Sequence, residues 1–161
     1  MQIRDEQAGD IDAIRALHTI AFGQSQEAGL VDQLRADGDS VISLVAIEAD
    51  SIVGHILFSP MSAPFQALGL APLAVQPAMQ GRGIGSALVE AGLQRVAAGP
   101  WRAVFVLGDP AYYGRFGFEA ALASGFRSPY AGPYLMALAL GGPLPVREGR
   151  IDYAPAFAAL G

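Results

Sequence analysis

In the first third of the chain, apolar residues recur at helical spacing. Apolar positions repeat every three or four residues in 10–22, which predicts an amphipathic helix with Asp10 as its N-cap. The same spacing in 27–38 predicts a second helix that ends at Gly38. Residues 2–6 precede both segments, and we expect them to form a short strand.

The following segments have the composition of strands. Residues 41–59 hold two β-branched runs that meet at residues 49–50, a pattern that predicts a hairpin. Residues 60–69 contain two prolines and predict a loop. Residues 70–75 form another short apolar run, which Pro72 interrupts. Because a proline cannot donate to a β ladder, we expect this strand to bulge or to part from a neighbour there.

The second half of the chain alternates between helix and strand patterns. Two apolar stripes run along a helix that ends near Ala98, as expected for a helix lying on a sheet. The continuous apolar run 102–108 is typical of a strand buried on both faces. Residues 109–118 predict a short helix and a turn, and 134–140 predict a further strand. Together these elements predict an α/β protein, a sheet with helices on both faces, in a single domain over 1–161.

Composition narrows the classes of protein to which the chain can belong. The 161 residues are 52% hydrophobic and include no cysteine, which excludes disulfides, thiolate metal sites and a cysteine nucleophile. All ten basic residues are arginine, so a Schiff-base lysine is excluded too. The net charge of −5 and the scattered arginines disfavour nucleic-acid binding. We find neither a signal peptide nor a membrane span, and expect a cytoplasmic protein.

Three glycines at alternate positions stand directly before the helix that ends near Ala98. Gly81, Gly83 and Gly85 follow a strand, and the first N–H groups of a helix lack intrahelical partners, so this layout indicates an anion site. The dinucleotide fingerprint would need glycine where Ser86 stands, and a P-loop would need a lysine. The other interpretation is a tight turn with close packing of helix on strand, which needs glycine equally.

The glycine turn also resembles a known family motif. Residues 80–85, QGRGIG, resemble the Q/R-x-x-G-x-G/A motif of the GNAT acetyltransferase superfamily, and residues 111–118, AYYGRFGF, resemble a later element of that family. The block LGDPAYYGRFGF is similar to the YhbS-like subgroup. The resemblance implies a GNAT fold: a mixed, mostly antiparallel sheet of about seven strands, with helices on both faces and strands four and five splayed. It also implies acetyl transfer from acetyl-CoA to a primary amine of a small molecule or peptide, by direct attack.

The resemblance implies which residues bind the cofactor. The pyrophosphate of CoA would lie on the amides of the glycine turn, and the pantetheine arm would lie between the splayed strands. The residues implied are Leu73, Ala74, Val75, Gln80, Gly81, Arg82, Gly83, Ile84, Gly85, Ser86, Asp109 and Tyr112. The main chain of Ala74 would donate to the oxyanion. Asp109 has a second interpretation, because Asp-Pro at a helix start is also a good N-cap.

The chemistry implied by the resemblance needs an acid for the departing thiolate and a base for the amine. Tyr113 stands where the family carries its general acid, although the neighbouring aromatic residues also predict an apolar cluster. Many relatives carry a glutamate where this chain has Ala71, so the base is left open. Phe22 and Glu27 are expected to border the acceptor groove, where Glu27 would hold a cationic substrate. Glu27 alternatively only favours the N-terminus of its helix.

Several alternatives remain open from the sequence. His18 and His55 are interpreted as packed histidines, and no metal-binding pattern is present. Without a glutamate at Ala71, the chain could be a non-catalytic CoA or acyl-CoA sensor. The sequence also leaves open whether the transferred acyl chain is longer than acetyl and whether the acceptor is a nucleophile other than an amine. The tail, residues 141–157, is expected to add a hairpin or to cover a sheet edge, and so to offer a surface for a homodimer.

Overall fold

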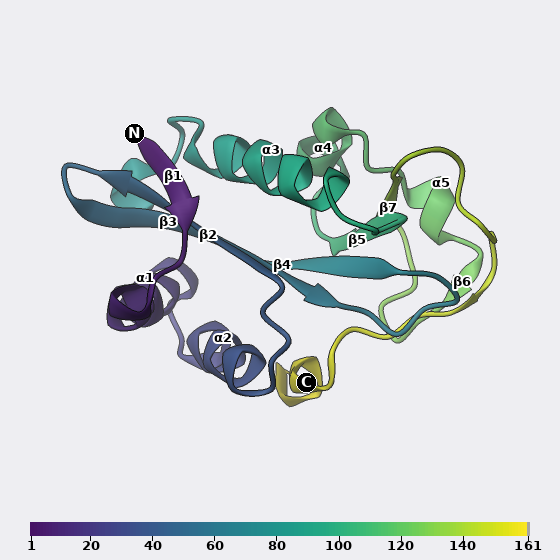
Figure 1. Ribbon diagram of the computed structural model, residues 1–161, viewed down its shortest axis with the longest axis horizontal. Coiled ribbons are helices and arrows are strands. Elements are labelled where there is room, and N and C mark those ends of the chain that lie inside the picture. The colour runs from purple at the N-terminus through teal and green to yellow at the C-terminus, as the bar shows by residue number, and fades with distance from the viewer. Residues whose placement is uncertain (161) are drawn as a thin grey trace.

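A computed structural model describes residues 1–160, and its centre is a six-stranded sheet. The strand order is β1-β2-β3-β4-β5-β7, and all neighbours are antiparallel except β4 and β5. Figure 1 shows this twisted sheet edge-on between two layers of helices. The strands are β1 Gln2–Asp5, β2 Ile42–Glu48, β3 Ser51–Pro60, β4 Ala67–Val75, β5 Ala103–Leu107 and β7 Leu135–Ala139.

Helices cover both faces of the sheet, as predicted. On one face lie α1 (Ile11–Phe22), α2 (Gln26–Ala36) and the C-terminal 3-10 helix η4 (Pro155–Leu160), and α3 (Ile84–Ala97) lies on the other (Figure 1). Two helices of one turn each, α4 (Pro110–Tyr113) and α5 (Ala120–Ala123), follow β5. The short strands β6 (Phe126–Arg127) and β8 (Gly149–Arg150) form a separate parallel pair. The remaining 3-10 turns are η1 (Ala8–Asp10), η2 (Pro77–Met79) and η3 (Gly114–Phe116).

Most predicted elements are present, with corrections at three places. The hairpin turns at Ala49 and Asp50, both with positive φ, and Gly38 ends α2 with a φ of +77°. Asp10 is the N-cap residue of α1, as predicted, but its carboxylate does not cap the helix and instead accepts the main-chain N–H of Gln7 at 2.7 Å. The tail adds a strand beside β6 rather than a hairpin, and the main sheet has six strands, with two more in the small pair.

Strand β4 begins earlier than predicted and leaves its neighbour β5 midway. Residues 67–69 pair with β5 in parallel, although the sequence predicted a loop there. Position 69 requires glycine, because the Tyr153 ring lies against Gly69 and fills the space of a side chain. Beyond Gly69 the pairing with β5 ends. Opposite Leu57 of β3, β4 then holds two residues, Ala71 and Pro72, so the strand both bulges and parts from a neighbour, as Pro72 predicts.

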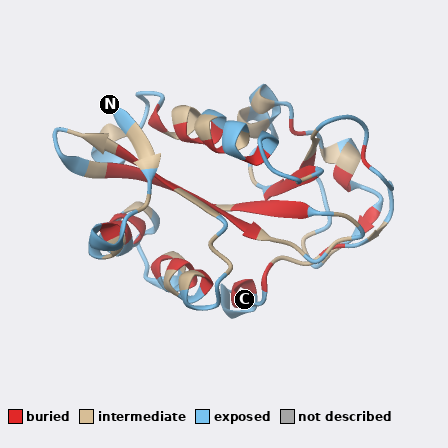
Figure 2. Ribbon diagram, in the orientation of Figure 1, coloured by how far each residue is buried: buried red, intermediate tan, exposed pale blue. Residues whose placement is uncertain are grey.

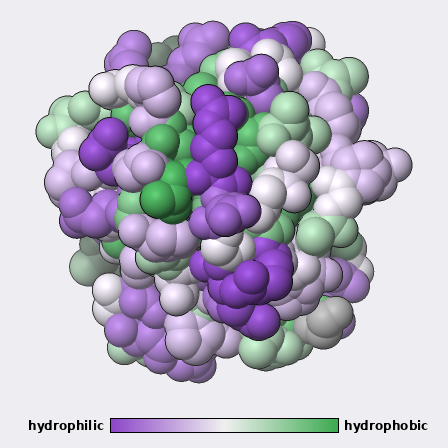
Figure 3. Space-filling view, turned by 90° about the vertical axis from the view of Figure 1, so that its right-hand side faces the viewer, coloured by the Kyte–Doolittle hydropathy of each residue, from purple (hydrophilic) through white to green (hydrophobic). Residues whose placement is uncertain are grey.

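The sheet separates two apolar cores (Figure 2). The core under α3 contains Phe58, Leu88 and Val96, which are fully buried, and a Cβ at Gly92 would overlap the Phe58 ring. The core under α1 and α2 contains Leu34 and residues of η4. A third cluster, around β6, joins the far ends of β5 and β7 to the tail. Figure 3 looks at this end of the molecule, where hydrophobic residues surface between hydrophilic side chains. No helix of residues 1–160 is long and apolar enough to cross a bilayer.

The two histidines are buried together between α1 and β3. His18 Nε2 lies 2.8 Å from His55 Nδ1, and His55 Nε2 lies 2.7 Å from Ser43 Oγ. Ser43 donates its single proton to the Glu6 carboxylate at 2.7 Å, so His55 Nε2 must be the donor to Ser43. His18 then donates to His55, which leaves His18 Nδ1 unprotonated and without a partner in the described chain.

Burial determines the charge of this histidine pair. It lowers the pKa of His18 to about 4 and holds the pKa of His55 well below its ordinary value, with the positive charge of Arg35 acting in the same direction. Both rings are therefore neutral in the folded protein at pH 7. The interpretation of both as packed histidines agrees with this environment.

Two helical glycines give stability predictions of opposite sign. Gly92→Ala is expected to lower the free energy of unfolding by about 1 kcal/mol or more, because overpacking costs about 1–3 kcal/mol and exceeds the gain in helix propensity. Gly29→Ala, on an exposed face of α2 with no atom within 4 Å of the new Cβ, should raise it by up to about 1 kcal/mol. Urea unfolding measures both. If both substitutions changed the free energy of unfolding in the same direction, the result would contradict the close approach of α3 to Phe58.

Acid should destabilise the fold through the histidine pair. The unfolded chain takes up a proton on each ring below pH about 6.5, whereas folded His18 does so only near pH 4. The free energy of unfolding should be greatest above pH 6.5 and fall towards pH 4, by about 3 kcal/mol for His18 alone. Urea unfolding between pH 4 and 8 tests this. The His18→Phe variant should be less stable at pH 7, but its free energy of unfolding should depend less on pH. An unchanged pH dependence would contradict the assignment of the acid destabilisation to the histidine pair.

Candidate active site

The turn between β4 and α3 is open to solvent. Gly81 and Gly83 both have a φ of +80°, which side chains rarely adopt, and a Cβ at either would meet no atom within 4 Å. These glycines are therefore needed for backbone conformation and not for close packing. The open surroundings of Gly81 and Gly83 favour the anion-site interpretation at these two positions, whereas Gly85 is closely packed, since a Cβ there would lie 3.6 Å from Val75 Cγ2.

Six consecutive amides at this turn have no protein acceptor. No N–H from Gly81 to Ser86 donates to a carbonyl of the described chain, and the first helical bond of α3 runs from Ala87 N to Gly83 O at 3.0 Å. The first turn of α3 also carries no acidic residue. Free amides and the positive end of the helix dipole together make this turn a site for an anion.

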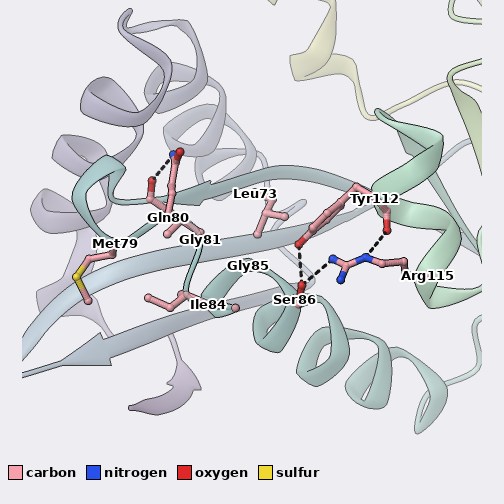
Figure 4. Close-up of a pocket in the computed structure, with 11 residues that line it drawn as sticks. Leu73, Met79, Gln80, Gly81, Ile84, Gly85, Ser86, Tyr112 and Arg115 are labelled. Atoms are coloured by element: carbon pink, nitrogen blue, oxygen red, sulfur yellow. Dashed lines mark hydrogen bonds between the residues drawn. The ribbon is translucent and has the colours of Figure 1, made fainter.

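The amides open onto a first pocket of about 440 Å³ (Figure 4). The pocket extends from the glycine turn along β4 to α4. Gly85 shapes its wall, because a Cβ there would lie 3.0 Å from the Tyr112 hydroxyl oxygen. The lining residues are Leu73, Val75, Met79, Gln80, Gly81, Gly83, Ile84, Gly85, Ser86, Tyr112 and Arg115.

Arg115 supplies the positive charge of the first pocket, which the sequence analysis missed. Its Nη2 donates to Ser86 Oγ at 3.0 Å, and its guanidinium carbon lies 4.8 Å from the centre of the Tyr112 ring (Figure 4). Arg82, which was predicted for this role, is exposed and does not line the pocket. The sequence spacing could have predicted this contact, because Arg115 is three residues after Tyr112 and a helical turn places such residues on the same side.

The ladder between β3 and β4 corrects the predicted oxyanion donor. Gln76 N donates to Val53 O at 2.8 Å, and Val75 is opposite Gly54. Since the direction of main-chain groups alternates along an antiparallel strand, Ala74 exchanges its hydrogen bonds with His55. Its N–H is therefore occupied. The N–H and C=O groups of Leu73 and Val75 face the gap that β5 leaves, and the Val75 carbonyl accepts from Gln80 Nε2 at 3.2 Å (Figure 4).

A second pocket, of about 240 Å³, lies on the other side of the same segment of β4. Leu73 lines both pockets, and the consecutive residues Tyr112 and Tyr113 line one each. Phe22 and Glu27, predicted for the acceptor groove, both line the second pocket. Its lining residues are Phe22, Glu27, Leu30, Leu70, Ala71, Pro72, Leu73, Leu107, Tyr113, Phe157 and Leu160.

Tyr113 belongs both to the second pocket and to an aromatic cluster. Its ring packs edge-on against Tyr112 and Phe118, with centroids 5.0 and 5.8 Å apart. A Cβ at Gly108 would lie 2.5 Å from this ring, so the glycine lets the tyrosine approach the end of β5. Burial and the neighbouring Tyr112 raise the pKa of Tyr113 to about 12. The hydroxyl therefore stays protonated at neutral pH and can serve as a donor.

Asp109 is an N-cap and lines neither pocket. Its Oδ1 accepts the main-chain N–H of Ala111 at 2.9 Å, and Pro110 occupies the first position of α4. The capping interpretation of Asp109 is therefore confirmed, and the cap orients the short helix that carries both tyrosines, while the cofactor contact stays a prediction. Among residues 1–160, no cluster of three or more histidine or acidic side chains is placed to hold a metal ion.

Sequence comparison identifies the family. Residues 39–120 match the family described as Acetyltransferase (GNAT) domain. The chain is 41% identical to the uncharacterized N-acetyltransferase YhbS of Escherichia coli K12 over 125 residues, which are 75% of each chain. It is 42% identical over 118 residues to the uncharacterized N-acetyltransferase YjhQ of the same strain, covering 68% of this chain and 65% of that one.

Solved structures with the same fold contain a thiol cofactor. The crystal structure of E. coli YhbS in complex with CoA matches 99% of this chain and 93% of its own, with a TM-score of 0.92 and 35% identity. A GNAT family acetyltransferase from Brucella melitensis in complex with acetyl-CoA matches 97% of each chain, with a TM-score of 0.84 and 36% identity. The open glycine turn, the parted strands and these matches agree, and the chain belongs to the GNAT family of acetyltransferases.

Proposed function

We propose that this protein transfers the acetyl group of acetyl-CoA to a primary amine by direct attack. The observation that carries the proposal is the meeting of two pockets at Leu73, one of which has the six free amides of residues 81–86 at its mouth. A bisubstrate reaction without a covalent enzyme intermediate needs this arrangement. The acyl donor and the acceptor enter from opposite sides, and their reacting atoms meet in the gap between β4 and β5.

The residues of the first pocket fit the donor substrate. The amides of Gly81 to Ser86 would hold the pyrophosphate, and Arg115, which lines the pocket, would add positive charge beside it. The pantetheine arm carries amide groups of its own. The main-chain groups of Leu73 and Val75 face the gap and offer these amides the partners that β5 would have supplied.

We assign the chemical step to Leu73 and Tyr113. The Leu73 N–H replaces that of Ala74 as the oxyanion donor, a role whose loss in other acyl-transfer enzymes costs about 2.7–4 kcal/mol. Tyr113 would donate to the departing sulfur. With a pKa of about 12 against about 8.5 for a thiol, complete proton transfer is uphill by about 5 kcal/mol. A hydrogen bond to sulfur, followed by proton transfer as the amine nitrogen loses its own proton, avoids this cost.

A non-catalytic CoA sensor is the alternative, favoured by Ala71 in the place of a glutamate. The discriminating measurement is thiol release from acetyl-CoA with and without an amine panel. Because the chain has no cysteine, every thiol detected comes from the cofactor. Binding of CoA without any amine-dependent release would establish the sensor and end the enzymatic proposal.

Gly83→Ala should weaken CoA binding by about 10-fold. A side chain at a φ of +80° costs about 1–2 kcal/mol and is relieved by rotating the amides away from the anion. Gly38→Ala is the matched control, since Gly38 has a φ of +77° and the same open surroundings but lies at the end of α2. Calorimetry should find CoA affinity unchanged in that control. Equal affinities of both variants for CoA would refute the proposal that the glycine turn binds the pyrophosphate.

Tyr113→Phe should lower kcat by about 100-fold, because a positioned proton donor contributes at least that factor in most enzymes. CoA affinity should remain as in the parent protein, since Tyr113 does not line the first pocket. The control is Tyr134→Phe, which alters a tyrosine with 60% of its surface exposed. A fall of kcat below threefold for Tyr113→Phe would assign this ring to packing alone.

A further inference from the structure

The second pocket has an apolar wall and a single charged group. Nine of its eleven lining residues are apolar, contributed by α1, α2, β4, β5 and η4, and the two others are Glu27 and Tyr113. Its volume of about 240 Å³ is below the range of about 300–1,000 Å³ typical of ligand pockets. Such a site accommodates one small apolar group beside one polar atom. It offers no partners for a chain of hydroxyls or for several cations.

Glu27 is the one carboxylate among the residues that line the two pockets. No other carboxylate and no imidazole lines the two pockets, and Tyr113 holds its proton. The buried histidines are committed to each other and to Ser43. Position 71, the place of the glutamate that many relatives carry, supplies only a methyl group to the same pocket. A base for the amine must therefore come from Glu27 or from solvent.

The surroundings of Glu27 leave its charge unneutralised. Gln24 Nε2 donates to both carboxylate oxygens, at 3.1 and 3.3 Å, and thereby fixes the side chain. None of the arginines in the described part of the chain lies within salt-bridge distance of it. The elements packed around it, α1 and η4, present Phe22, Phe157 and Leu160 to the pocket, and the only other titratable group there is Tyr113. A cationic head group would therefore meet one partner.

We propose that the second pocket binds a small amine with an apolar body, and that Glu27 holds its ammonium group and removes the first proton. This inference rests on the proposed function. The apolar body of the substrate would lie against Leu30, Leu107 and Phe157. The nitrogen would lie between Glu27 and the gap at Leu73, where it can reach the thioester.

The proton balance of the step is complete without another reactant. Glu27 takes one proton from the ammonium and later returns it to solvent. The neutral nitrogen attacks the carbonyl carbon, forming the C–N bond, and the C–S bond then breaks. The sulfur receives a proton from Tyr113, and the second proton released by the nitrogen restores that hydroxyl. The products are an N-alkyl acetamide, CoA and one free proton.

Matched amines test the apolar body. Hexylamine and 2-(2-aminoethoxy)ethanol have chains of equal length, and the second places an ether and a hydroxyl where the first has carbon. We expect kcat/KM to be at least about 10-fold higher for hexylamine, since even one methylene in an apolar pocket discriminates by about 10-fold or more. Spermidine, with several cations, should be a poorer substrate than hexylamine. Preference for either polar amine would overturn the inference and leave the acetyltransferase proposal intact.

Glu27→Gln tests the base. At pH 7 the variant should lose about 100-fold in kcat/KM for hexylamine, and this loss should shrink below about 10-fold near pH 10, where about a quarter of the amine is already neutral. A loss that is the same at all pH values would overturn the proton-transfer role. The matched control is Glu90→Gln, on the exposed side of α3, which should leave the pH profile unchanged.

Two further readouts separate this inference from the proposed function, and the first of them is independent of turnover. Calorimetry of hexylamine added to the CoA-bound protein should give a negative heat-capacity change, the mark of apolar burial. Leu107→Asn, at a residue with 45% of its surface exposed, should reduce the preference for hexylamine over the polar amine without unfolding the protein. Binding of hexylamine without turnover would refute the enzymatic proposal, and with it the role of Glu27. Turnover with an unaltered preference in Leu107→Asn would refute the pocket assignment alone.

Discussion

Strands β4 and β5 are hydrogen-bonded over only three residue pairs, and beyond Gly69 and Phe105 they separate. Every feature of the candidate active site follows from this separation. It leaves the main chain of Leu73 and Val75 without a neighbouring strand on one side, where the Val75 carbonyl accepts from Gln80 Nε2 instead, because β5 continues to pair only with β7. An unpaired strand edge inside a protein must be satisfied by water or by a ligand. In the proposed function, the gap is therefore both the place where the two pockets meet at Leu73 and the place where the amides of the ligand would find partners.

The rest of the fold holds this gap in place from both faces. On one face, the Phe58 ring under Gly92 brings α3 close to the sheet and aims its N-terminal amides at the gap. On the other face, His18 and His55 fix α1 to β3, the strand that pairs with the site segment of β4. The site combines open backbone with neighbours that are fully buried, which is how a protein keeps unsatisfied groups oriented.

The sequence predicted the location of the site better than its atomic details. Gly81 and Gly83 were informative because a positive φ has few other solutions, and Pro72 was informative because it lacks an N–H. The direction of the amide of Ala74 could not be predicted, since the bulge at Ala71–Pro72 adds one residue to β4 and shifts which residues face the gap. The early start of β4 depended on Tyr153, which is distant in sequence. Arg115 was overlooked because its value depends on how α4 is oriented by the Asp109 cap.

Tyr112 and Tyr113 are neighbours on a helix of a single turn, yet they form walls of different pockets. Successive helical residues point about 100° apart, so this single turn faces both pockets at once. Any rotation of the turn about its axis would displace both walls together. In the proposed reaction, the donor site and the acceptor site would therefore share one structural element. By thermodynamic reciprocity, the change in donor affinity that the acceptor causes would equal the change in acceptor affinity that the donor causes.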